Sequence, residues 1–79
     1  MKIYNVMLEG KDDKIEYFIT FEVASSSQAH AEELALNEAS KRGLNIIGIE
    51  EVEVKGQMKP SVKSRVLKVY GKSYFINEE

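Results

Sequence analysis

The alternation of apolar and polar residues is strictest between Ile15 and Val23. One parity is apolar throughout and consists of Ile15, Tyr17, Ile19, Phe21 and Val23. The other parity consists of Glu16, Phe18, Thr20 and Glu22. A period of two over nine residues, rich in β-branched and aromatic side chains, predicts a half-buried strand. We expect this strand to organise the core, with its odd positions inside and Phe18 on the opposite face.

A second alternating segment, Lys2 to Leu8, precedes this strand. Both of its parities carry apolar residues, which predicts a strand with two partly covered faces. Residues 9–14, with a glycine and two aspartates, have the composition of a polar hairpin loop. We therefore expect the two strands to pair antiparallel.

The period changes after Val23, and residues 29–42 are rich in Ala, Leu and Glu, which favour a helix. Ser25 and Gln28 have the spacing of a capping box, and Gly43 is a suitable residue to end the helix. One broad face of the predicted helix has small or apolar side chains: Ala29, Ala31, Ala35, Leu36 and Ala39. Such a face can approach a sheet closely, so that large strand residues fill the space between them.

Two further strands are predicted, over residues 44–55 and 62–70, with a turn or loop at 56–61. In the first of them the apolar parity changes between Ile49 and Val52. A single register would bury Glu50 or Glu51, and an unpaired buried carboxylate is costly. We therefore expect a β-bulge at Glu50–Glu51.

The segment after Tyr70 allows two structures. Gly71 suits the first central position of a type II′ turn, which would make residues 73–77 a fifth strand in a hairpin. The alternative is one long strand with a kink at Gly71. The hairpin is slightly favoured. The predicted fold is α+β, in the order β-β-α-β-β with a possible short fifth strand, as an antiparallel sheet with one helix on one face.

The composition is that of a small globular protein. The chain has 79 residues, of which 43% are hydrophobic, and we expect residues 1–79 to form a single domain. There is no cysteine, no apolar run long enough to span a membrane and no signal-like N-terminal segment. These features favour a soluble, cytoplasmic protein.

Little in the chain suggests catalysis. The single histidine, His30, falls on the polar face of the predicted helix without a second ligand at helical spacing. Gly71-Lys72-Ser73 resembles the end of a phosphate-binding loop, but Val66 stands where that motif has a glycine. No metal or cofactor is expected, and the chain is not predicted to be an enzyme.

Charge is unevenly distributed along the chain. Residues 1–40 hold 3 lysines and 8 acidic residues, whereas residues 41–79 hold 8 basic and 5 acidic residues. The basic half is interleaved with aromatic residues, as in proteins that bind single-stranded nucleic acid by phosphate attraction and base stacking. The predicted binding residues are Lys63, Arg65, Lys68, Tyr70, Lys72, Tyr74 and Phe18.

Two functions fit this pattern. The first is a non-enzymatic protein-binding module, a small accessory or inhibitor protein of the kind that phages and mobile elements encode, acting on a larger protein or protein complex. The alternative is an RNA- or single-stranded-DNA-binding domain that uses the basic, aromatic C-terminal half. The acidic first half argues against the alternative, because it would repel phosphate. Phe18 on an uncovered face is expected to be either a contact residue or part of a self-association patch. For a chain this small, a homodimer through that face or through an edge strand would add buried surface.

Overall fold

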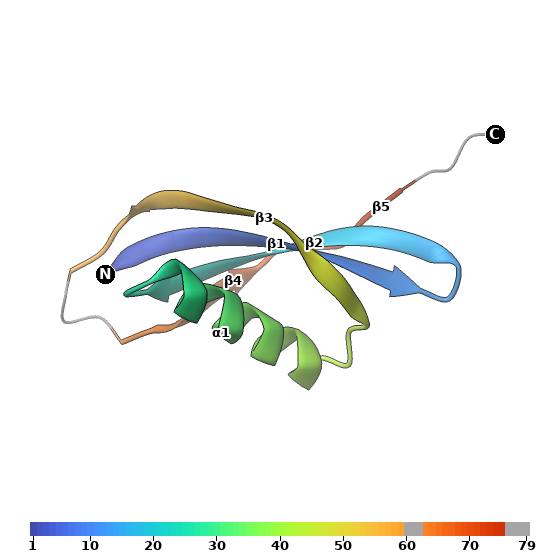
Figure 1. The fold of residues 1–79 in the computed structure, drawn as a ribbon, viewed down its shortest axis with the longest axis horizontal. Helices are drawn as coiled ribbons and strands as arrows, with labels where there is room; N and C mark the ends of the chain where they lie inside the picture. The colour runs from blue at the N-terminus through green and yellow to red at the C-terminus, as the bar shows by residue number, and fades with distance from the viewer. Residues whose placement is uncertain (60–62, 76–79) are drawn as a thin grey trace.

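The computed structural model describes residues 1–59 and 63–75 (Figure 1). Its elements are β1 (Lys2–Asp12), β2 (Ile15–Ser25), α1 (Gln28–Lys41), β3 (Ile46–Gln57), β4 (Arg65–Val69) and β5 (Ser73–Tyr74). The predicted order of strands and helix is confirmed, and the fold is α+β.

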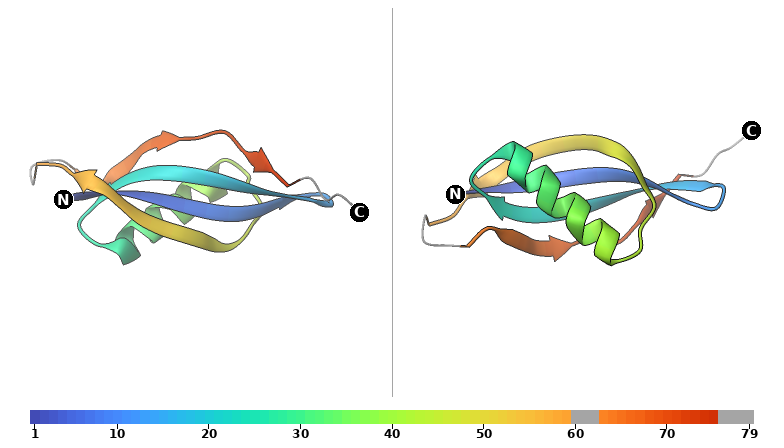
Figure 2. Two further views of the ribbon diagram at one scale, coloured as in Figure 1. Left: turned by 90° about the horizontal axis from the view of Figure 1, so that it is seen from above. Right: turned by 60° about the horizontal axis from the view of Figure 1, so that its bottom comes forward.

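The strands form one antiparallel sheet in the order β3-β1-β2-β4, with β5 paired to β2 beyond the end of β4. The helix α1 crosses one face of this sheet diagonally (Figure 2). The strand that begins at Ile15 is therefore central, since β2 pairs with β1 on one side and with β4 and β5 on the other. We call the face under α1 the helix side and the opposite one the open face.

The core lies between α1 and the two central strands. The alternating residues of β2 from Tyr17 to Val23 are buried, as predicted. The prediction is wrong for Ile15, which lies at the strand end beside the turn and is exposed. The other core residues are Tyr4, Val6 and Leu8 from β1 and Ala31, Ala35 and Ala39 from α1. Three alanines on the helix let its axis approach the sheet, and the large strand side chains fill the interface.

The start of the helix differs in detail from the prediction. Ser27 is the N-cap, and its hydroxyl accepts a hydrogen bond from the His30 amide at 3.2 Å. The predicted capping box with Ser25 is wrong, because Ser25 ends β2 and is buried, with its hydroxyl donating to the Ser27 carbonyl. Leu36 and Ala29 are exposed, while Leu34 packs against the core.

The β1–β2 hairpin is longer than expected. The predicted six-residue loop at 9–14 is wrong, because β1 runs to Asp12 and only Asp13 and Lys14 form the turn. Asp13 has φ of 56°, a left-handed conformation that aspartate tolerates in turns. The ladder of paired residues continues up to this turn, from Gly10 paired with Tyr17 to Asp12 paired with Ile15.

Strand β3 is irregular. Its register against β1 shifts at three places, one of them between Met7 and Leu8, whose partners are Glu51 and Ile49. Glu50 is the extra residue there, so the predicted bulge is confirmed. It allows Val52 and Ile49 to lie on the helix side while Glu51 stays on the open face. The observed bounds lie two residues further along the chain than the predicted 44–55.

The C-terminal segment follows the less favoured alternative. β5 pairs with β2 and not with β4, so the predicted hairpin is wrong. β4 and β5 run along the same edge of β2, with the Tyr70 amide donating to the Thr20 carbonyl at 2.9 Å. They form one interrupted strand with Gly71 in the interruption. The predicted positions 62, 76 and 77 lie outside the described residues.

Candidate functional site

Three of the predicted binding residues gather at the β4 edge of the sheet. Arg65 and Lys68 pair with Ala24 and Glu22 of β2, which places both on the open face. The Lys68 ammonium lies 4.6 Å from the centre of the Tyr70 ring, within the range of a cation–π contact. Lys63 precedes β4 and is exposed.

Lys72 and Tyr74 belong to a different cluster, on the helix side at the far end of the hairpin. The Asp12 carboxylate accepts hydrogen bonds from the Lys72 ammonium at 2.7 Å and from the Tyr74 hydroxyl at 2.8 Å. The Lys72 ammonium also lies 4.6 Å from the centre of the buried Tyr17 ring. These hydrogen bonds, from Lys72 first and then Tyr74, lower the pKa of Asp12, and the bond to Asp12 raises the pKa of Lys72.

The basic, aromatic stretch is thus divided between two faces. Register places Lys68 opposite Glu22 on the open face, but Tyr74 opposite Tyr17 on the helix side. A further basic residue, Lys55, forms an ion pair with Glu22 across β1, and hydrogen bonds to Glu22 and then Tyr70 raise its pKa. The positive charges therefore do not form one continuous surface.

Phe18 lies on the open face, as its parity predicts, but it is partly covered. Its ring meets that of Phe75 edge to face, with 4.4 Å between the ring centres. The Phe75 amide donates to the Glu16 carbonyl at 2.9 Å, which extends the pairing of the C-terminal segment with β2. The exposed aromatic surface at this end of the molecule thus comes from Tyr74 and Phe75.

The open face is acidic over β3 and the two central strands. Register places five glutamates on it: Glu9, Glu16, Glu22, Glu51 and Glu53. Partial desolvation, followed by the hydrogen bond and charge of Glu16 and then the charge of Glu50, raises the pKa of Glu9. This repulsion disfavours further negative charge on the open face, including that of a phosphate backbone.

The sequence pattern gave no reason to assign a binding role to β3, which lies at one edge of the sheet. Three of its apolar side chains are strongly exposed: Ile47 at 54%, Ile49 at 39% and Val54 at 53%. The stretch from Glu51 to Val54 pairs with β1 in regular register, and its other side forms the edge of the sheet. The three glutamates at 50, 51 and 53 were the sequence signal that this strand lies at an edge, since charged side chains commonly protect edge strands from pairing.

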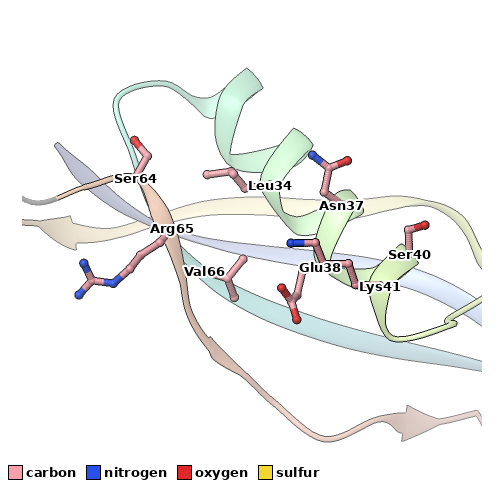
Figure 3. A pocket seen from close by; sticks show the side chains of 8 residues that line it. All are labelled: Leu34, Asn37, Glu38, Ser40, Lys41, Ser64, Arg65 and Val66. Atoms are coloured by element: carbon pink, nitrogen blue, oxygen red, sulfur yellow. The ribbon is translucent and has the colours of Figure 1, made fainter.

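A groove of about 590 Å³ lies between α1 and β4 (Figure 3). Its lining residues are Leu34, Asn37, Glu38, Ser40, Lys41, Ser64, Arg65 and Val66. Leu34 and Val66 supply its apolar surface, while the Arg65 guanidinium points away from the helix (Figure 3). Because β4 borders the groove and is an edge strand, a strand added to β4 would lie next to the groove.

Among residues 1–59 and 63–75, no three His, Cys, Asp or Glu side chains are grouped so as to hold a metal ion. No helix in the described ranges is long and apolar enough to cross a membrane.

Comparison with known proteins gives no relative. No family model, no curated protein and no solved structure matches this chain.

Proposed function

We propose that the chain is a non-enzymatic protein-binding module that accepts an extended segment of a partner protein at its β3 edge. The observation that carries this proposal is the position of β3 at one end of the sheet, combined with the exposure of Ile47, Ile49 and Val54. An added strand would use the outer backbone groups of β3 and cover these side chains, which is the usual basis of strand addition.

The side chains of β3 define what the partner segment should carry. Glu51 and Glu53 lie on the open face, whereas Val52 and Val54 lie on the helix side. A complementary segment therefore has basic residues on one face and apolar residues on the other. This surface fits an accessory or inhibitor protein that attaches to a larger partner by binding such a segment of the partner.

Nucleic-acid binding is the weaker alternative. It would use Arg65, Lys68 and Tyr70, which do share a face at the β4 edge. However, Lys72 is paired with Asp12, Lys55 is paired with Glu22, and the neighbouring central strands are acidic. These ion pairs reduce the net positive charge available to phosphate.

Affinity purification from nuclease-treated and untreated lysates tests both functions. The protein-binding proposal expects a stoichiometric protein partner that survives nuclease treatment and is lost when Glu51 and Glu53 are both changed to Lys. The control is Glu32→Lys/Glu33→Lys, which makes the same charge change on the helix and should retain the partner. Loss of all bound material after nuclease treatment, or retention by the β3 variant, would overturn the proposal.

A further inference from the structure

The segment that complements β3 has a counterpart within the same chain. β3 and β4 lie at opposite edges of the sheet. In the part of the chain that the structure describes, neither strand has a neighbour on its outer side. β4 carries Arg65 and Lys68 on the open face and Val66 and Val69 on the helix side. We propose that the β3 edge of one molecule pairs with the β4 edge of a second copy of this chain. This inference rests on the proposed function of the β3 edge.

Charge matches on one face of this pairing. In a continuous sheet the open faces of the two copies align, so Glu51 and Glu53 of one copy lie beside Arg65 and Lys68 of the next. The described residues include no ion pair made by any of these four side chains. Opposite charges on neighbouring strands favour pairing, and like charges oppose it, which selects β4 against a second β3.

Apolar contacts match on the other face. Val52 and Val54 lie on the helix side of β3, and Val54 is exposed by 53%. Val66 of β4 lies on the same side and lines the groove beneath α1 together with Leu34 (Figure 3). A β3 strand added beside β4 would place the exposed Val54 on the side of the sheet on which this groove lies, while Val52 stays packed against its own core.

Strand direction is compatible with the same arrangement. Every neighbouring pair in the sheet is antiparallel, so β3 and β2 run in one direction while β1 and β4 run in the other. A second copy that continues the sheet thus brings its β4 antiparallel to β3. The contact joins two different surfaces, so it propagates into a ring or an open chain of molecules rather than closing as a symmetric dimer.

The length of the contact limits its strength. The regular part of β3 spans only Glu51 to Val54, and β4 contains 5 residues with a register shift after its pairing with Glu22. Bulges on either side interrupt a longer ladder, which is how edge strands avoid uncontrolled pairing. Association should therefore be reversible and should weaken as salt screens the charges.

Sedimentation velocity over a range of protein and salt concentrations tests the proposal with two charge-reversed variants. Glu51→Lys/Glu53→Lys and Arg65→Glu/Lys68→Glu should each associate at least about tenfold more weakly than the natural chain, because like charges then face each other. A mixture of the two variants should associate again, since each supplies the edge that the other has lost. Recovery in the mixture also shows that both variants are folded.

The matched controls are Glu32→Lys/Glu33→Lys on the helix and Lys11→Glu/Lys14→Glu at the end of the β1–β2 hairpin. Both make the same net charge change as a test variant and should associate like the natural chain. The inference is overturned if the natural chain stays monomeric at every concentration, or if the mixture associates no better than its components. If the chain is monomeric while the β3 variant still loses a protein partner, the proposed function stands and only the second-copy inference fails. If the β3 variant keeps its partner, the proposed function itself fails.

Discussion

Asp12 and Lys72 lie 60 residues apart in the sequence, and their charged groups are 2.7 Å apart. Asp12 ends β1, while Lys72 immediately precedes β5. The ion pair and the hydrogen bond from Tyr74 therefore attach the C-terminal segment to the β1–β2 hairpin. Only two residues of β5 pair with β2, so these side-chain contacts contribute much of what holds the segment.

Replacing Asp12 with Asn should loosen β5 without unfolding the rest of the sheet. The substitution removes the charge that attracts Lys72 but leaves the β1 backbone intact. We expect faster hydrogen exchange at the Phe75 amide, which donates to the Glu16 carbonyl, and unchanged exchange in the centre of β1. Asp13→Asn is the control, because Asp13 is exposed in the turn and asparagine tolerates its backbone conformation. Equal protection of Phe75 in both variants would contradict this role.

The same ion pair predicts a dependence on acid. The pKa of Asp12 is lower in the folded chain than its ordinary value of 3.8, so the unfolded chain binds the proton first as the pH falls. The contribution of Asp12 to stability is present above that ordinary value and is lost as the pH falls through the lower, folded value. Denaturant unfolding at several pH values should show this loss in the natural chain and not in Asp12→Asn.

Glu9 should have the opposite effect. Its pKa in the folded chain is raised above the ordinary 4.5, chiefly by desolvation and then by Glu16, so the folded chain binds the proton more readily. Its charged form therefore costs stability, and this cost appears as the pH rises through the raised value. Glu9→Gln should be more stable than the natural chain at pH 7, with the difference shrinking in acid. Glu33→Gln on the exposed side of the helix is the control; an equal gain there would show that net charge alone is responsible.

The strands and the helix could be predicted because their patterns are local. The alternation in Ile15–Val23 and the alanines of the helix each specify one element and the face that it buries. The bulge at Glu50 was also predictable, because the parity of apolar residues changes across it. The length of the hairpin was not, because Asp12 and its neighbours are polar and are held in the ladder by contacts distant in sequence.

The candidate site was less accessible to sequence reasoning. Lys68 and Lys72 have the same parity, so an uninterrupted strand would place them on the same side of the sheet. The strand is interrupted at Gly71, and the two residues fall on opposite faces. The edge position of β3 is a property of strand order, which alternation does not encode. The complementarity of β3 and β4 therefore becomes visible only when register assigns each charge to a face.

Gly10 is required by a contact across the hairpin. It pairs with Tyr17, and a Cβ at position 10 would overlap the tyrosine Cζ and hydroxyl. Tyr17 is fully buried and so has little room to move. Gly10→Ala should therefore lower the free energy of unfolding by about 1–3 kcal/mol, the usual cost of overpacking.

The control is Gly48→Ala, where nothing lies within 4 Å of the added carbon. This substitution should change the free energy of unfolding by less than about 0.5 kcal/mol in denaturant titrations. Equal effects would exclude the contact with Tyr17 as the cause.

Deletion of Glu50 tests the role of the bulge. Glu51 already pairs with Met7 and Ile49 with Leu8, so removing the residue between them leaves a continuous ladder. We expect the deletion variant to fold with Ile49 and Val52 still on the helix side.

Deletion of Val52 is the control, because it shifts one part of the strand by a residue and exchanges its faces. Circular dichroism and denaturant unfolding should show a cooperative transition for the first variant and a strongly destabilised chain for the second. Comparable destabilisation by both deletions would mean that the bulge is needed for folding and does not merely keep the register.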